Sequence, residues 1–241
     1  MSIPSVDVAV PARVRELARG AALRAVWLNN LGGVTFRTDD GRYIKHGPRN
    51  AETSMRDEAE RMRWARRWTR VPEVIDHGED GTEEWLVTVA IDARSAVDPR
   101  WVDEPATAVR ALGEGLRMLH EALPVAECAW SWEVPARIAN AAGRGIAIPA
   151  DLRTPPETDL LVVCHGDACA PNTLLDDDGR PVAHVDLAAL GIADRWADIA
   201  VTAMSTEWNY GPGWQDALVT AYGLTPDRER MAYYQDLWNA T

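Results

Sequence analysis

Short hydrophobic runs in the first third of the chain alternate with polar positions and are separated by turns rich in Gly, Asn and Asp. A period of two over such runs is typical of strands that bury one face. The pattern predicts strands over 25–27, 34–37 and 42–45, preceded by a short amphipathic helix over 11–22. Together the three strands predict an antiparallel meander whose third strand ends at Lys45.

A helix and two more extended segments are predicted directly after the meander. Residues 55–68 have helical spacing, with Ser54 placed to cap the helix and Glu58 near its start. A proline favours extended backbone over 71–75, and a β-prone run over 84–91 follows the next turn. The first part of the chain is therefore predicted to have the order β-β-β-α-β-β.

Apolar residues recur three and four positions apart in the second part of the chain, which is the period of an amphipathic helix. The clearest case is 105–123, where Ala and Leu side chains keep this spacing for the whole length of the predicted helix. Gly223 stands where a helix C-terminus favours a left-handed residue. The other predicted helices are 135–144, 193–208, 214–222 and 226–238.

One polar stretch interrupts the helical pattern. Apolar runs at 160–163 and 173–175 predict buried strands, and the Asp-Asp-Asp-Gly sequence that follows predicts a hairpin turn. The return strand ends on Asp186, whereas Asp167 and Asn172 lie in the loop before the hairpin. Because a hairpin can bring these three side chains together, we expect a site that holds a metal and activates a hydroxyl.

The two halves and the segment between them define the expected fold class. Residues 92–98 lack periodicity and are predicted to be a linker. The chain is therefore predicted to be an α+β protein with a β-rich N-terminal lobe over 1–91 and a mainly α-helical C-terminal lobe over 99–241.

Composition restricts the partners. Acidic residues number 37 against 25 basic ones, and the net charge is −12. This balance argues against a nucleic-acid partner and permits a polycationic small molecule, although solubility alone also explains it. The 3 cysteines favour a reducing cytoplasm, and no run approaches the roughly 18 apolar residues of a membrane span. We expect a cytoplasmic protein, a monomer or weak dimer, without a membrane partner.

Phosphoryl transfer is the chemistry that uses all of these parts. That reaction depends on positioning and charge neutralisation rather than on covalent work by the protein. Lys45 is the one lysine among 25 basic residues, and a lysine on a third strand can bind phosphate oxygens. A Gly-containing turn can lie over phosphates, a helix Glu can orient the lysine, and Asn and Asp can hold Mg²⁺.

The sequences CHGDACAPNTLL at 164–175 and HVDLAALGIADRWADIA at 184–200 resemble the signature of the aminoglycoside phosphotransferases, which are relatives of the protein kinases. The residues of these two motifs are most similar to those of the 3′-phosphotransferases. The resemblance implies a protein-kinase-like fold of two lobes, the first of which binds nucleotide. It also implies transfer of phosphate from ATP or GTP, with Mg²⁺, to an aminoglycoside hydroxyl, the 3′-hydroxyl in the nearest group, and thereby antibiotic resistance.

The resemblance also assigns roles residue by residue. Asp167 matches the catalytic aspartate, Asn172 and Asp186 match the Mg²⁺ ligands, and Lys45 matches the phosphate-binding lysine. Glu58 matches its helix partner, with Glu60 as the near alternative. The remaining matches are Asn30, Gly32, Gly33 and Thr35 in the nucleotide-positioning loop, Val89 and Ile91 in the hinge beside the base, and His165 and Asp198 as supports of the catalytic loop.

The sequence departs from the family pattern where the acceptor is expected. Ala188 and Ala189 stand where Gly-Arg is common after the metal-binding aspartate, and the C-terminal acidic pair is displaced or missing. The candidates that remain for binding acceptor amines and sugar rings are Glu207, Asn209, Asp236 and Trp208.

Three alternatives stay open. A related kinase could phosphorylate another acceptor, such as a peptide antibiotic, a macrolide or a metabolite. The chain could also be a non-catalytic nucleotide-binding module. Finally, His165 and His184 flank the same strands as Asp167 and Asp186, and these four residues could form a two-metal hydrolase site.

Overall fold

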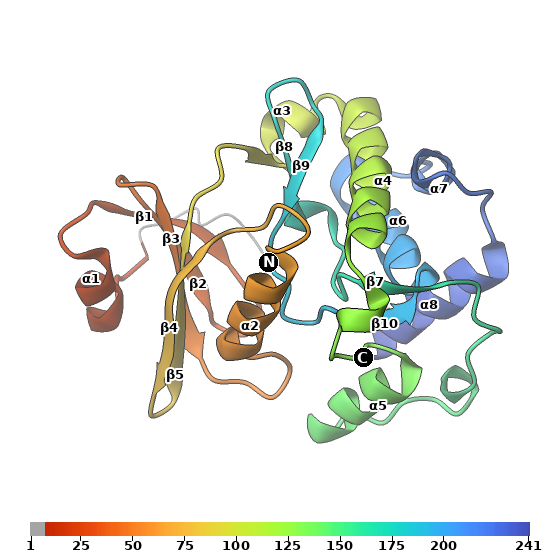
Figure 1. Ribbon diagram of the computed structural model, residues 1–241, viewed down its shortest axis with the longest axis horizontal. Coiled ribbons are helices and arrows are strands. Elements are labelled where there is room, and N and C mark those ends of the chain that lie inside the picture. The colour runs from red at the N-terminus through yellow and green to blue at the C-terminus, as the bar shows by residue number, and fades with distance from the viewer. Residues whose placement is uncertain (1–7) are drawn as a thin grey trace. The chain divides into compact units, whose positions relative to one another are not determined.

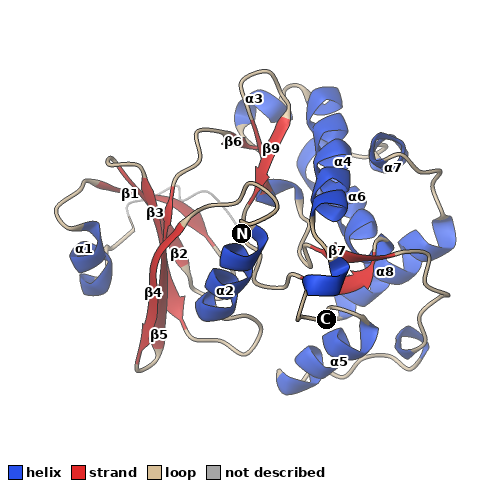
Figure 2. Ribbon diagram, viewed as in Figure 1, coloured by secondary structure: helices blue, strands red, loops and turns tan. Residues whose placement is uncertain are grey.

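The computed structural model describes residues 8–241. The chain divides into two compact units, of which the first comprises Met1–Arg66 and Pro72–Ile91 and the second comprises Arg67–Val71 and Asp92–Thr241. Strands predominate in the first unit and helices in the second, as Figure 2 shows. This distribution is that of an α+β protein, as the sequence pattern predicts.

A five-stranded antiparallel sheet in the order β1-β2-β3-β5-β4 forms the first unit. Helices α1 and α2 lie on opposite faces of this sheet (Figure 1). The predicted meander, helix and two further strands are confirmed in that order. The elements are α1 (Ala12–Ala18), β1 (Leu23–Leu28), β2 (Val34–Thr38), β3 (Arg42–Pro48), α2 (Met55–Ala65), β4 (Val74–Asp80) and β5 (Glu83–Val89).

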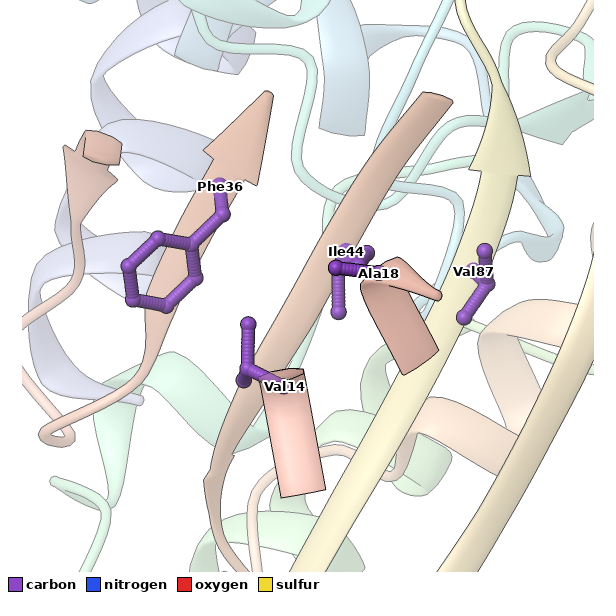
Figure 3. Close-up of a cluster of buried hydrophobic side chains, with 5 residues drawn as sticks. All are labelled: Val14, Ala18, Phe36, Ile44 and Val87. Atoms are coloured by element: carbon purple, nitrogen blue, oxygen red, sulfur yellow. The ribbon is translucent and has the colours of Figure 1, made fainter. Parts of the chain in front are cut away.

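The core under α1 explains which face of the sheet is apolar. Val14 and Ala18 of α1 pack against Phe36, Ile44 and Val87 from three strands (Figure 3). All five side chains are at most 2% exposed. Because successive residues of a strand point to opposite faces, the neighbours of Ile44 and Val87 point to the α2 face.

Several element boundaries in the first unit differ from the prediction; β4, for example, covers 74–80 where extended backbone over 71–75 is predicted. Helix α1 ends at Ala18 rather than at 22 because Arg19 adopts a left-handed conformation with φ of 53°. The prediction that Lys45 ends the third strand is wrong, because β3 continues to Pro48, which pairs with Glu83 of β5. Lys45 is therefore central in its strand, between partners on both sides.

Helix α2 begins as predicted, and two side chains hold its start. Ser54 accepts a hydrogen bond from the Asp57 N–H at 3.0 Å, and Glu84 of β5 accepts one from the Met55 N–H at 2.9 Å. Both satisfy donors that the first turn leaves without helical partners. The helix ends at Ala65, before the predicted 68.

The second unit is built around α4, which packs against α6 and α7. α4 confirms the prediction over 105–123 within one residue, and Gly223 follows α7 in a left-handed conformation with φ of 103°. The helices are α3 (Pro99–Val102), α4 (Pro105–Ala122), α5 (Val134–Gly143), α6 (Trp196–Tyr210), α7 (Gln215–Tyr222) and α8 (Arg228–Ala240).

Two small antiparallel sheets complete the second unit, in the orders β6-β8-β9 and β10-β7. The predicted hairpin is confirmed as β8 and β9. The 92–98 segment contains β6, which pairs with β8, and residues 193 and 194 belong to β10 rather than to a helix because they pair with β7. The strands are β6 (Arg94–Ser95), β7 (Leu161–Cys164), β8 (Thr173–Leu175), β9 (Pro181–His184) and β10 (Gly191–Asp194).

Among the residues that the structure describes, no helix combines the length and the apolar character needed to cross a membrane.

Candidate active site

Lys45 and Glu58 form an ion pair in the first unit. The Lys45 Nζ lies 2.7 Å from Glu58 Oε1 and 3.0 Å from Oε2. The Glu58 side chain is 4% exposed, whereas that of Lys45 is 26% exposed. A buried carboxylate thus holds an ammonium group that solvent and ligands can still reach.

The alternation of β3 and the phase of α2 create this pair. Ile44 points into the core under α1, so Lys45 points to the α2 face of the sheet. Of the two predicted helix partners, Glu58 contacts Lys45, whereas Glu60 pairs with Arg56 at 3.3 Å on the exposed side of α2. The structure therefore selects Glu58 over Glu60.

The predicted nucleotide-positioning turn joins β1 to β2. Asn29 organises it, because its side-chain Oδ1 accepts hydrogen bonds from the N–H groups of Leu31 at 3.0 Å and Gly33 at 2.6 Å. A Cβ on Gly33 would lie 2.6 Å from Asn29 Nδ2, so a larger residue there would displace the Asn29 side chain. The sequence prediction named Asn30, which is exposed, and missed Asn29.

Four further residues of the prediction lie in this sheet or beside it. Thr35 pairs with Lys45 in the register of β2 and β3, so their side chains share one face. Gly32 has φ of 83°, a conformation that favours glycine. Of the predicted hinge residues, Val89 donates its N–H to the Glu73 carbonyl within the first unit and Ile91 is half-buried.

The loop between β7 and β8 brings Asp167 and Asn172 together in the second unit. Asn172 Nδ2 donates to the Asp167 carbonyl at 2.9 Å and lies 3.3 Å from Asp167 Oδ2. Asn172 in turn accepts a hydrogen bond at its own carbonyl from the Val185 N–H, directly before Asp186. The predicted grouping of Asp167, Asn172 and Asp186 is thus present in the structure.

The charge of Asp186 influences the pKa of Asp167. Burial raises the pKa of Asp167 above its usual value and the negative charge of Asp186 adds to this, whereas hydrogen bonds from Cys169 and Asn172 oppose it. Asp186 itself adopts a left-handed conformation with φ of 64°. A non-glycine residue in that region is uncommon and is often found at functional sites.

The oxygen donors of Asn172 and Asp186 fit a magnesium ion. Because Asn172 donates through its amide nitrogen, its Oδ1 is the side-chain atom that can bind a cation. A carboxylate and an amide carbonyl are hard oxygen ligands of the kind that Mg²⁺ prefers. These two residues could therefore hold the metal that phosphoryl transfer requires.

His165 braces the loop, as its resemblance to the family implies. Its Nε2 lies 2.9 Å from the Val185 carbonyl oxygen, and its Nδ1 accepts from the Asp167 N–H at 3.3 Å. Both ring nitrogens are thus engaged with backbone groups, and neither is available to a metal ion. His184 is buried with its Nε2 unpaired among the described atoms, and burial lowers its pKa to about 3. Neither histidine supports the hydrolase alternative.

Asp198 of α6 holds the backbone at the start of the same loop. Its carboxylate accepts hydrogen bonds from the N–H groups of His165 and Gly166 and lies 3.0 Å from His120 Nε2. Burial alone would raise the pKa of Asp198, but the hydrogen bond and charge of His120 outweigh it and lower the pKa. Asp198 therefore remains an acceptor that fixes the loop backbone.

In the second unit, sequence reasoning missed two further residues. His120 of α4 is buried and bridges Asp198 to the hydroxyl of Tyr222, which lies 2.9 Å from its Nδ1. A histidine on the apolar face of a predicted helix was the available signal. The second is Cys169, whose Sγ lies 3.0 Å from Asp167 Oδ1.

The turn after Asp186 forms without the glycine that the family pattern favours. Ala188 and Ala189 are both buried, and neither has a positive φ. A Cβ on Gly166 would lie 2.2 Å from the Ala189 carbonyl oxygen, so the close approach is accommodated by Gly166 instead. The two alanines are therefore compatible with an ordered loop.

The acceptor-binding candidates lie on α6 and α8. Trp208 is 54% exposed and its ring centroid is 5.3 Å from that of Trp238. Glu207 and Asp236 are exposed, whereas the Asn209 side chain donates to the Ser205 carbonyl at 2.7 Å. Trp208 and the two acids lie at exposed positions of the second unit, whereas Trp238 is half-buried and the Asn209 side chain is partly engaged within its own helix.

Comparison with known proteins places these features in one family. An aminoglycoside 3′-phosphotransferase of Streptomyces fradiae is 36% identical over 225 residues, covering 80% of this chain and 83% of that protein. The streptomycin 3″-kinase of Streptomyces griseus is 30% identical over 250 residues, covering 88% and 90%.

Solved structures agree. An aminoglycoside-3′-phosphotransferase of type VIII superposes with a TM-score of 0.77 at 28% identity, covering 95% of this chain and 97% of that one. An aminoglycoside phosphotransferase of Streptomyces rimosus, at 24% identity and a TM-score of 0.74, covers 95% and 96%. These neighbours confirm the predicted protein-kinase-like α+β fold.

The family model that describes the phosphotransferase enzymes matches residues 13–234 of the chain. That span includes Lys45, Glu58 and the whole loop around Asp167. The chain belongs to the phosphotransferase enzyme family.

Proposed function

We propose that this enzyme transfers the γ-phosphoryl group of ATP or GTP to a hydroxyl of an aminoglycoside antibiotic, the 3′-hydroxyl, and thereby inactivates it. The observation that carries the proposal is the Asp167 carboxylate, held by Asn172 and influenced by the charge of Asp186. A carboxylate so placed can accept the proton of an attacking hydroxyl while the neighbouring oxygens hold a cation.

The acceptor hydroxyl donates its hydrogen bond to Asp167, its oxygen forms a bond to the γ-phosphorus, and its proton passes to the carboxylate. The bond between the γ-phosphorus and the bridging oxygen breaks, and the nucleoside diphosphate leaves. Lys45, oriented by Glu58, donates hydrogen bonds to phosphate oxygens. Asn172 and Asp186 would hold Mg²⁺, which would supply positive charge against the phosphates.

The acceptor class rests on charge and on the named relatives. Aminoglycosides are polycations, and the net charge of −12 favours their approach through long-range attraction. Two of the relatives carry names that specify phosphorylation of an aminoglycoside, at 36% and 30% identity. A structural neighbour from Streptomyces rimosus has been solved with ADP and streptomycin. Because the reaction consumes a nucleoside triphosphate, the cytoplasm is the proposed location.

The test is an acceptor panel with purified enzyme, Mg²⁺ and ATP or GTP. We expect release of nucleoside diphosphate and a gain of one phosphoryl group with kanamycin- and neomycin-type acceptors, mapped by NMR to the 3′-oxygen. The matched control is the same aminoglycoside without its 3′-hydroxyl, which we expect to be inert. If streptomycin were the one acceptor turned over, the proposal that the 3′-hydroxyl is phosphorylated would be wrong. Turnover of only a macrolide or peptide antibiotic would overturn the acceptor class.

Asp167→Asn tests the role of the base separately. The amide keeps the shape of the carboxylate but cannot take the proton, so we expect kcat to fall by about 10²- to 10⁴-fold. The melting temperature should not fall, because a buried negative charge near Asp186 is removed. Nearly unchanged turnover with a folded variant would show that another group accepts the proton.

A further inference from the structure

The Asp167 carboxylate has a second partner besides Asn172. The Sγ of Cys169 lies 3.0 Å from Asp167 Oδ1, whereas Asn172 Nδ2 lies 3.3 Å from Oδ2. Each oxygen of the carboxylate is therefore held by a different side chain of the same loop. Since each oxygen has two lone-pair directions, this arrangement still leaves room to accept a proton from a ligand hydroxyl.

The chemistry of the two groups sets the direction of the contact with Cys169. An ionised carboxylate can only accept hydrogen bonds, so the thiol must donate. Cys169 is 4% exposed, and burial together with the charge of Asp167 raises the pKa of its thiol well above the usual value. The group therefore stays protonated, and it is a donor rather than a nucleophile.

The donor is itself held in place by α6. Ser205 Oγ accepts a hydrogen bond from the Ala170 N–H at 2.9 Å, and Thr202 Oγ1 donates one to the Ala168 carbonyl at 2.8 Å. The loop is thus fastened to the helix on both sides of Cys169, so the position of the thiol is determined by a rigid element.

We propose that Cys169 is a positioning residue whose thiol, anchored on α6, holds one oxygen of Asp167 and so fixes the orientation of the carboxylate toward the acceptor hydroxyl. The inference rests on the proposed role of Asp167 as the base. A small error in the orientation of a reacting group reduces the rate strongly, whereas binding of nucleotide and acceptor by other residues is unaffected. The contribution of Cys169 should therefore be found in kcat rather than in KM.

The experiment compares Cys169→Ala with Cys169→Ser in the full chain. Alanine removes the donor, and we expect kcat to fall about tenfold with both KM values within about twofold of wild type. Serine retains an O–H donor, and we expect it to return kcat to within about threefold of wild type. Both substitutions remove the packing contacts of the sulfur atom, so both should lower the melting temperature. A difference in kcat between the two variants would therefore not follow from a difference in their stability.

Cys128→Ala is the matched control. Cys128 is another free thiol of the second unit, but its Sγ contacts the Trp130 carbonyl rather than Asp167. We expect the kcat of this variant to stay within about twofold of wild type. An alanine variant at 169 with wild-type kcat, or a serine variant no more active than alanine, would overturn the proposal.

Infrared spectroscopy of the S–H stretch tests the contact independently of turnover. A thiol that donates to a carboxylate absorbs at lower frequency than a free thiol. We expect the band that disappears in Cys169→Ser to be the most strongly shifted of the three thiols. A band at the free-thiol position would contradict the proposal even if alanine failed to fold. If instead wild type turned over no aminoglycoside, the proposed function would fail while this band still reported on the contact.

Discussion

Two buried carboxylates of this enzyme, Glu58 and Asp198, are held in opposite ways. Glu58 lies on α2 in the first unit and binds the ammonium group of Lys45, a side chain that is 26% exposed. Asp198 lies on α6 in the second unit and binds two backbone N–H groups and the imidazole of His120, all of them buried. One carboxylate holds a cation that a ligand can reach, and the other holds the protein's own chain.

The difference indicates which property each residue controls. If Glu58 becomes neutral, Lys45 can turn to solvent, so the fold loses little and the orientation of the lysine is lost. If Asp198 is removed, the donors that it satisfies remain buried and cannot reach water. We therefore propose that Glu58 orients Lys45 for ligand binding, whereas Asp198 fixes the backbone of a loop.

Asp198→Ala should produce the largest effect and is the strongest test of this comparison. We expect the free energy of unfolding to fall by about 3–5 kcal/mol, because the variant leaves the His165 and Gly166 N–H groups and His120 without their acceptor. Urea denaturation measures the loss, and activity should fall with it. The control is Glu207→Ala on the exposed side of the same helix, expected within about 0.5 kcal/mol of wild type. An Asp198→Ala variant as stable as the control would break the comparison.

Glu58→Gln should show the reverse pattern with a smaller energy. We expect kcat/KM for the nucleotide to fall about tenfold, because the lysine is no longer held against phosphate oxygens, while the free energy of unfolding changes by about 1 kcal/mol or less. Steady-state kinetics and urea denaturation of one preparation measure both. Glu60→Gln, two positions along α2, is the matched control and should change neither. A Glu58 variant that loses stability but keeps its nucleotide kinetics would reverse the assigned roles.

The pH dependence of stability should show the smallest effect and sharpens the account of Asp198. Its pKa in the folded protein lies below the ordinary 3.8, so its stabilising contribution is complete above that value and is lost as pH falls through the lower folded pKa. We therefore expect the unfolding free energy of Asp198→Asn to depend less on pH than that of wild type below about pH 4. Denaturation across acidic pH tests this, and parallel curves for the two proteins would contradict the lowered pKa.

Local patterns predicted most of the secondary structure for a physical reason. Burial of one face imposes a period of two on strands and about 3.6 on helices, so the meander, α4 and the hairpin were identified correctly. The errors occurred where a long-range partner extends an element: β3 passes Lys45 because β5 pairs with it to Pro48, and residues 193 and 194 form a strand because β7 lies beside them.

The candidate site also contains residues that local sequence patterns identified and residues that they did not. The spacing within the loop placed Asp167 near Asn172, and the strand after the hairpin brought Asp186 into reach, because these contacts span few residues. The choice between Glu58 and Glu60 depended on which side of α2 faces the sheet. The positions of the two residues in the sequence did not determine that side. Asn29 was missed because an Asn in a turn carries no signal that distinguishes it from its neighbour Asn30.

By itself, the sequence determined the elements, the loop spacing and the isolated lysine, since each follows from interactions between residues close along the chain. Only the tertiary structure decided that His120 reaches Asp198, 78 positions away, and that the Cys169 thiol points at the Asp167 carboxylate. Contacts of this kind depend on how helices and loops pack in three dimensions, because most buried polar groups pair with whichever partner the fold brings close.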